Sequence, residues 1–294
     1  MLILVKNHSL PIRLDRYLRL SHPNLTQGVI EKNLRKGYIK VNNLKSSANN
    51  RVKNGDEILL PDSLQQPEEE ETNAIDNPAV IALSKKLLSE NLIFTHQDFY
   101  AINKQAGIPV QGGNKVKFSI DDCFDYLKKS GHDLRLVHRL DQDTSGILLI
   151  ARNREAAITL TSAFKNHLIN KTYLAILAGT PIDNEGTIEN ELMGKFARTD
   201  YQVIASYNNF SLIKFMPITG RTHQLRIHAL DLGTYIVGDD KYGPQNQKTN
   251  LMLHAYKAEL SADIFGESIE IKHSPNPKFM QLIKKLFDID DINC

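Results

Sequence analysis

The sequence predicts a protein of the α+β class, in which a small α/β unit precedes a larger, mostly antiparallel mixed sheet flanked by helices. A chain of 294 residues, 41% hydrophobic and 24% charged, is long enough for one large and one small domain. An acidic stretch over residues 63–78, which contains Gln and Pro, marks a boundary between them. Beyond it, closely spaced strand patterns occur without the regular strand–helix rhythm of a parallel sheet.

Two short amphipathic helices are expected near the start of the chain. The first is indicated by three apolar residues at i, i+3, i+4 spacing, which are Leu14, Tyr17 and Leu18. The second is expected to run from Thr26, as its N-terminal cap, to about Lys36, with Gly37 as its stop. Alternation over residues 38–42 and an Asn54-Gly55 turn before residues 57–60 then predict a small sheet.

The net charge of +2 conceals an uneven distribution along the chain. Residues 1–62 hold eleven Lys and Arg against five Asp and Glu, residues 63–78 hold five acids and no base, and residues 79–294 are nearly neutral. Four consecutive glutamates and two prolines favour a solvated linker over 63–78. The bases of the first unit form either ordinary solvated helix faces or a surface that contacts phosphates.

The rest of the chain, residues 79–294, predicts a second domain with strands and helices. Strand patterns cover residues 92–95, 100–102, 146–151, 172–177, 201–205 and 210–215. Helix patterns cover residues 153–168, 222–232 and 276–286. The close spacing of the strands favours antiparallel pairing, with the helices packed against the sheet.

Several classes of protein and site are disfavoured by the sequence. The two cysteines cannot build a disulfide framework or a Cys-rich zinc site, and no H-E-x-x-H is present, so no metal is expected. The sequence contains no phosphate-binding P-loop, and no dinucleotide-binding G-x-G-x-x-G motif follows a predicted strand. No nucleotide cofactor is therefore expected either. The apolar run at the N-terminus is too short for a signal peptide and no stretch is long enough to span a membrane, so we expect a cytoplasmic protein.

Two polar segments have the composition of an active site. Within residues 136–151, two apolar strand patterns bracket a loop with an arginine, two carboxylates, two hydroxyls and a glycine. In residues 219–226, Gly220 permits a tight turn and Thr222 is placed to cap the following helix. An arginine at that turn could pair with a carboxylate of the first loop and lower its pKa by ~1–3 units. Ordinary turn and cap chemistry is the alternative for both segments.

The motifs in these segments resemble those of the pseudouridine synthases of the RluA type. The matching blocks are His138-Arg139-Leu140-Asp141-x-x-Thr144-Ser145-Gly146, Lys171-Thr172-Tyr173-Leu174-Ala175, Gly220-Arg221-Thr222-His223-Gln224-Leu225-Arg226, Asp239-Asp240-Lys241-Tyr242-Gly243 and Leu253-His254-Ala255. Residues 1–62 resemble the S4 RNA-binding domain, and residues 107–113 are similar to the C-type synthases that act on 23S ribosomal RNA.

This resemblance implies the conversion of uridine to pseudouridine in RNA, most simply 23S rRNA or a large-subunit precursor, without a cofactor. It implies that Asp141 is the catalytic carboxylate, which either adds covalently or removes a sugar proton. It implies that Tyr173 stacks on the flipped base, that Arg221 pairs with Asp141, and that Arg139 fills the space left by the uridine. The bases expected to contact RNA in the first unit are Arg13, Arg16, Lys32, Arg35, Lys36 and Lys40.

Three alternatives remain at this stage. The chain could be an RNA-binding assembly factor that keeps the fold without the reaction. It could modify another large-subunit site or transfer RNA. It could also be a glycosidase that uses Asp141 and Asp143 as paired carboxylates, although a basic RNA-binding unit has no purpose in such an enzyme.

Overall fold

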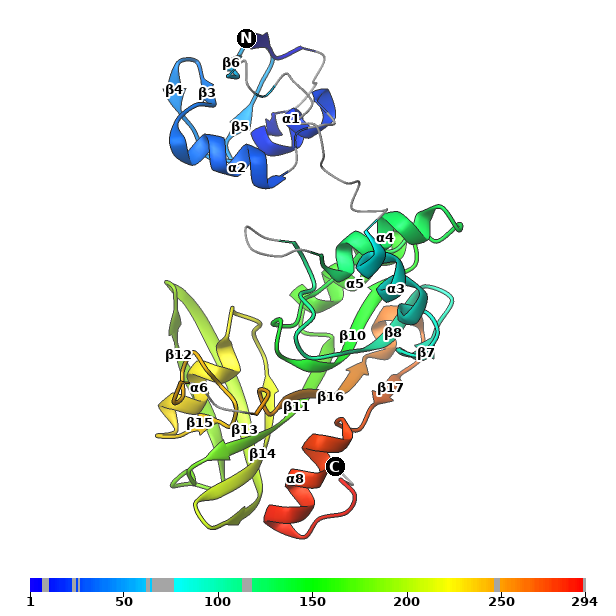
Figure 1. The fold of residues 1–294 in the computed structure, drawn as a ribbon, viewed down its shortest axis with the longest axis vertical. Coiled ribbons are helices and arrows are strands. Elements are labelled where there is room, and N and C mark those ends of the chain that lie inside the picture. Colours follow the sequence, from blue (N-terminus) through cyan, green and yellow to red (C-terminus); the bar gives the residue numbers. More distant parts are fainter. Residues whose placement is uncertain are drawn as a thin grey trace. The chain divides into compact units, whose positions relative to one another are not determined.

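The computed structural model describes residues 1–6, 11–22, 25, 27–61, 64, 77–112, 118–245 and 249–292. These residues form two compact units, one made of the described residues up to Leu64 and the other of those from Asn77 onward (Figure 1). Apart from Leu64, Asn77 and Pro78, the predicted linker lies outside the described residues. Within the described ranges, no helix is long and apolar enough to cross a membrane.

The first unit contains two helices, α1 (Leu14–Ser21) and α2 (Gln27–Lys36), and six short strands. The strands are β1 (Leu2–Leu4), β2 (Ile12–Arg13), β3 (Lys40–Val41), β4 (Leu44–Lys45), β5 (Arg51–Val52) and β6 (Glu57–Leu59). They form an antiparallel sheet in the order β1-β6-β3-β4 and a separate β2-β5 pair. Because β1 precedes both helices, the expected order of helices followed by a sheet is wrong at the N-terminus.

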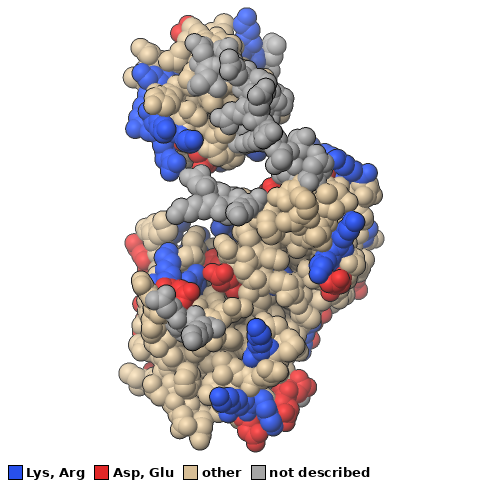
Figure 2. Space-filling model, in the orientation of Figure 1, with Lys and Arg blue, Asp and Glu red and all other residues tan. Residues whose placement is uncertain are grey.

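The core of the first unit confirms the predicted helical stripes. Its fully buried members include Leu14, Leu18 and Ile30. Helix α2 ends at Lys36 as predicted, while Thr26 lies outside the described residues. The strand expected from Tyr38 begins only at Lys40, because the amide of Tyr38 bonds back to the Asn33 carbonyl at 2.9 Å and closes the helix end. Figure 2 shows Lys and Arg side chains gathered on one flank of this unit.

The second unit is built on one sheet of eleven strands with six helices among the described residues. The strands are β7 (Leu92–Thr95), β8 (Phe99–Lys104), β9 (Arg135–Leu136), β10 (Ser145–Ala151), β11 (Ile169–Ala178), β12 (Glu185–Leu192), β13 (Lys195–Tyr207), β14 (Phe210–Pro217), β15 (Tyr235–Ile236), β16 (Leu253–Leu260) and β17 (Ile269–Lys272). The helices are α3 (Pro78–Leu87), α4 (Ile120–Lys128), α5 (Arg154–Lys165), α6 (Gln224–Asp231), α7 (Ala262–Phe265) and α8 (Pro277–Phe287).

The order of the main strands is β12-β13-β14-β11-β16-β10-β8-β7, with β9, β15 and β17 paired to β10, β11 and β16. Among the described strands every pairing is antiparallel except that of β10 with β16. The predicted fold class, a mostly antiparallel mixed sheet flanked by helices, is confirmed.

Alternation along the strands sends side chains into separate cores on the two faces of the sheet. In β10, Leu148 and Ile150 pack with α3 and α4, whereas Ile147 and Leu149 pack with α5. Helices α6 and α8 cover a third core, over β11, β13 and β14. All seven residues of β10 are buried, which makes this strand a rigid support for the loop that precedes it.

The boundaries of the helices follow local chemistry. Asn153 caps α5 by accepting the Ala156 amide at 2.8 Å, so the helix begins where its sequence pattern predicts. The expectation that Pro78 interrupts regular structure is wrong. It lies in the first turn of α3, where a proline loses no hydrogen bond, directly after the capping residue Asn77.

Candidate active site

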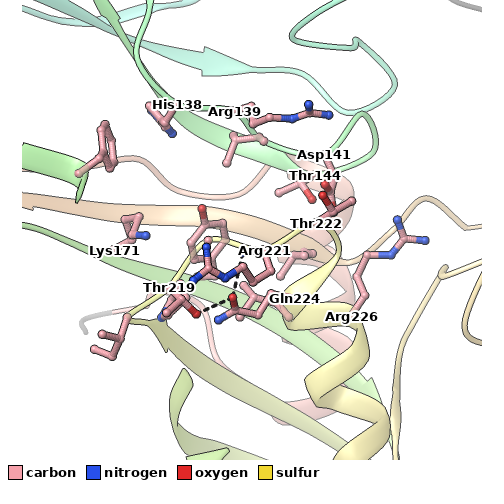
Figure 3. Close-up of a pocket in the computed structure, with 18 of the residues that line it drawn as sticks. His138, Arg139, Asp141, Thr144, Lys171, Thr219, Arg221, Thr222, Gln224 and Arg226 are labelled. Atoms are coloured by element: carbon pink, nitrogen blue, oxygen red, sulfur yellow. Dashed lines mark hydrogen bonds between the residues drawn. The ribbon is translucent and has the colours of Figure 1, made fainter. Parts of the chain in front are cut away.

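The two polar segments singled out in the sequence face one cavity of about 650 Å³ in the second unit (Figure 3). The first is the loop between β9 and β10, and the second is the turn between β14 and α6. The cavity is also lined by β11 and by the C-terminal end of α5. Four site residues expected from the sequence line it, namely Arg139, Asp141, Tyr173 and Arg221.

The loop that carries Asp141 is fixed by the buried Lys104. The ammonium of Lys104 donates to the carbonyls of Gln142 at 2.7 Å, Ile108 at 2.8 Å and Gln105 at 3.0 Å. Burial lowers the pKa of Lys104 to about 7, while the charges of nearby Asp143 and Asp141 oppose that shift. Three carbonyl acceptors favour the ammonium form, so Lys104 holds the backbone directly next to Asp141.

A second anchor of this loop is His138. Its Nε2 accepts the amide of Leu149 at 2.8 Å, and its ring packs on Phe164 with the ring centroids 4.5 Å apart. Burial, together with the charge of Lys171, lowers the pKa of His138 to about 3, so the ring is neutral. The imidazole nitrogen therefore accepts a backbone hydrogen bond from β10, in the way that a carbonyl of a neighbouring strand would.

Asp141 is the one carboxylate among the described residues that line the cavity. Asp143, two residues further on, is exposed and does not line it. The charge of Asp141 favours the protonated or cationic form of four neighbours, which are Lys104, Tyr173, His223 and Arg226. A lone carboxylate in the cavity removes the geometric basis for paired-carboxylate chemistry, which needs two.

Tyr173 projects from β11 toward the same cavity. Burial and the nearby charge of Asp141 raise the pKa of its phenol above the ordinary value, so the ring is neutral at pH 7. Its hydroxyl has no hydrogen-bond partner in the part of the chain that the structure describes. A neutral aromatic beside a carboxylate can stack on a base and offer a hydroxyl to it.

Arg221 does not form the predicted ion pair with Asp141. Its Nε donates to the Phe196 carbonyl at 2.9 Å, and no ion pair between Arg221 and Asp141 occurs among the described residues. The turn also differs from the prediction, because Thr222 does not cap α6. His223 precedes the helix in a left-handed conformation (φ 57°), and Gln224 accepts the Arg221 amide at 2.9 Å. This turn directs Arg221 toward β13.

The arginine whose charge is coupled to Asp141 is Arg226, to which sequence reasoning gave no role. Arg226 is buried and makes a bidentate ion pair with Asp239, with Nε–Oδ2 at 2.7 Å and Nη2–Oδ1 at 2.6 Å. Burial opposes the charged form, but Asp239, with a further contribution from Asp141, raises the pKa of Arg226 above its ordinary value.

The candidate RNA-contacting bases of the first unit divide into two groups. Arg13 is paired with Asp15 at 2.7 Å, so its charge is already compensated. The others form no ion pair with a described residue, and they are Arg16, Lys32, Arg35, Lys36 and Lys40. All but the half-buried Lys40 are exposed, and three of them, Lys32, Arg35 and Lys36, belong to α2.

Comparison with known proteins identifies the family. The sequence model of the RNA pseudouridylate synthases matches residues 98–231, a range that contains both polar segments. A ribosomal large subunit pseudouridine synthase C from Rickettsia bellii is 42% identical over 92% of this chain and 97% of its own length. The protein of the same name from Vibrio parahaemolyticus is 30% identical over 92% of this chain and 88% of its own.

Solved structures agree in fold. Human RNA pseudouridylate synthase domain containing 4 superposes with a TM-score of 0.61 over 71% of this chain and 97% of its own, at 24% identity. Human RNA pseudouridylate synthase domain containing 1 gives a TM-score of 0.53 over 64% and 83%, at 27% identity. Because the sequence similarity to the Rickettsia protein extends over nearly the full length of both chains, this chain belongs to the RNA pseudouridylate synthase family of enzymes, as a member of the RluA type.

Proposed function

We propose that this pseudouridine synthase modifies uridines of large-subunit ribosomal RNA and that Asp141 is its catalytic carboxylate. The observation that carries the proposal is the isolation of Asp141 in the cavity, with neutral Tyr173 and cationic Arg226 as neighbours. The substrate class is supported by the shared name of relatives that match most of this chain, ribosomal large subunit pseudouridine synthase C.

The reaction breaks the bond between N1 of uracil and C1′ of the sugar and joins C5 to the same carbon. The proton leaves C5 and N1 gains one, so no oxidant or reductant is consumed. Asp141 can act as a nucleophile or as the base that removes a sugar proton, and both routes need an ionised carboxylate. Arg226 places a positive charge close enough to interact with the charge of Asp141, while the ion pair with Asp239 keeps Arg226 in place.

Tyr173 and Arg139 would handle the flipped nucleotide. Stacking on an aromatic ring is worth ~1–3 kcal/mol per base, and Tyr173 lines the cavity. Arg139 is exposed at the cavity rim, two residues before Asp141, where it can enter the helix as the uridine leaves.

The test of the catalytic role uses a matched pair of variants. Asp141→Asn removes the charge with little change in shape, and we expect pseudouridine formation to fall by at least about a thousandfold with RNA binding retained. Asp143→Asn makes the same change two residues away, outside the cavity, and is expected to stay within a few-fold of wild type. Tritium release from RNA labelled at C5 of uracil measures both. Activity of Asp141→Asn within tenfold of wild type overturns the assignment.

The substrate is tested by mapping. Pseudouridine maps of ribosomal and transfer RNA are compared between cells with and without the gene, and the missing sites are expected in large-subunit rRNA. Loss confined to transfer RNA would contradict the proposed substrate and leave the reaction intact. No difference in any map would favour a non-catalytic assembly factor.

Residues 1–62 are proposed to be an S4-like RNA-binding domain, the acidic stretch that ends before the α3 cap Asn77 a linker, and the unit from α3 onward the catalytic domain. The support is the exposed face of α2, where Lys32, Arg35 and Lys36 stand without acidic partners in the described residues. Phosphate contacts by such bases give affinity that falls steeply with salt. A chain lacking residues 1–62 is therefore expected to bind RNA more weakly and with a smaller salt slope.

A further inference from the structure

One cationic residue of the cavity has no role in the chemistry described above. Lys171 lies on β11 two residues before Tyr173, so both side chains project from the same face of the strand. Figure 3 shows Lys171 on the side of the cavity opposite Asp141 and Arg226. Lys171 therefore marks a part of the cavity that is separate from the reacting carboxylate.

The ammonium of Lys171 has no counter-charge. It makes no hydrogen bond or ion pair with any residue that the structure describes, and its nearest aromatic contact is the Phe164 ring, 6.0 Å away. Burial lowers the pKa of Lys171 to about 8, and no carboxylate raises it. Arg226, by contrast, has an ion-pair partner in Asp239, and the Lys104 ammonium donates to three backbone carbonyls.

The surroundings of Lys171 carry further positive or neutral groups. Lys165 and His167, at the end of α5, line the same cavity and are exposed. His138, also in the lining, is a neutral ring whose pKa the charge of Lys171 helps to lower. A partly buried ammonium among such groups is costly unless a ligand brings a negative charge.

The ligand chemistry follows from the charge and from the position. A neutral uracil ring offers carbonyl oxygens but no charge, whereas each phosphodiester of RNA carries one negative charge. Lys171 lies about 6.7 Å along the strand from Tyr173, a separation comparable with the length of one nucleotide. A lysine two residues along the strand from the stacking ring suits the RNA backbone next to the flipped base better than the base itself.

We propose that Lys171 binds a phosphodiester of the RNA backbone adjacent to the target uridine. Lys165 and His167 form the outer, solvent-exposed part of this subsite. The proposal rests on the proposed function in one respect, which is that RNA enters the cavity with its uridine between Tyr173 and Asp141.

The experiment is a double-mutant cycle in which one change is made in the protein and the other in the RNA. A uridine-centred RNA hairpin is prepared with a single methylphosphonate, which removes one charge, placed in turn at each of three phosphates on either side of the uridine. Kd is measured for the wild type and for Lys171→Met, a substitution that keeps the length and removes the charge. Lys284→Met is the control, because the ammonium of Lys284, on α8, is already paired with Asp288 and Asp290, which follow the helix.

At one position the wild type is expected to lose about tenfold in affinity, the worth of a charge-assisted hydrogen bond. Lys171→Met is expected to bind unmodified RNA about tenfold more weakly than the wild type. A methylphosphonate at that position is expected to cause no further loss of affinity in this variant. Its plot of log Kd against log salt concentration is expected to be shallower by about 0.7, the contribution of one phosphate contact to a single strand. Lys171→Arg is expected to restore most of the affinity.

The proposal would be overturned if, at every methylphosphonate position, the loss of affinity from the RNA change simply added to the loss from Lys171→Met. It would also be overturned by an effect of Lys171→Met that disappears when the uridine is replaced by an abasic nucleotide, since the lysine would then contact the base. Thermal melting of Lys171→Met shows whether it is folded, and Lys171→Arg provides the test if it is not. Coupling without any pseudouridine formation would refute the proposed function alone, whereas product formation with additive losses would refute only the phosphate contact.

Discussion

Replacing Asp239 by asparagine is expected to destabilise the catalytic unit strongly, although Asp239 does not line the cavity. Its carboxylate is fully buried and accepts two hydrogen bonds from Arg226 and two from the amides of Lys241 and Tyr242. Burial alone would raise the pKa of Asp239, yet these partners hold it below the ordinary value. Asparagine can still accept from the amides, but it leaves the Arg226 charge buried without its partner.

Breaking a buried pair by removing one charge costs about 3–5 kcal/mol. For a unit of this size each kcal/mol lowers Tm by about 2–4 °C, so Asp239→Asn is expected to melt at least about 6 °C below wild type. Asp240→Asn is the matched control, because Asp240 is exposed and has no ion pair with a described residue. Differential scanning calorimetry measures both. Tm values within 2 °C of each other would refute the reasoning that Arg226 depends on Asp239.

Three further outcomes can be measured. Because the folded pKa of His138 is about 3, below its ordinary value, the stability it contributes is complete above pH 6.5 and is lost as pH falls. At pH 5 urea unfolding should show a loss of about 2 kcal/mol for wild type that His138→Gln lacks, and equal pH slopes would contradict this. Gly146→Ala should cost more than ~3 kcal/mol, since its Cβ would meet the Ala255 carbonyl oxygen, whereas Gly131→Ala, in open space with a similar positive φ, should cost ~1–2 kcal/mol. Converting Arg35 and Lys36 together to Gln should reduce the salt slope of RNA binding by about 1.4, and an unchanged slope would remove α2 from the interface.

Elements with a strong pattern and a local boundary signal could be predicted from the sequence. The helix after Asn153 and the buried strand before it were both expected, because a cap and a continuous apolar run depend on neighbouring residues. The first helix of the second unit was missed, since Pro78 was interpreted as a breaker although its position in the first turn of α3 costs nothing.

In the candidate site, too, some features could be predicted from the sequence and others could not. The family resemblance implied that Asp141, Tyr173, Arg139 and Arg221 belong to one site, and all four line the cavity, but it did not indicate that the charge of Asp141 acts on Arg226. That interaction depends on the left-handed turn at His223 and on an acid thirteen residues beyond Arg226 in the chain. Tertiary partners of this kind leave no trace in local periodicity.

The loop of Asp141 is held in one conformation before any RNA arrives. Lys104 fixes its backbone at Gln142, His138 ties its start to β10, and Gly146 brings its end against the backbone of Ala255. Its conformational entropy is therefore lost on folding and not on binding. Binding energy from the RNA is then free to unstack the uridine, and the part that must reorganise in the encounter is the nucleic acid.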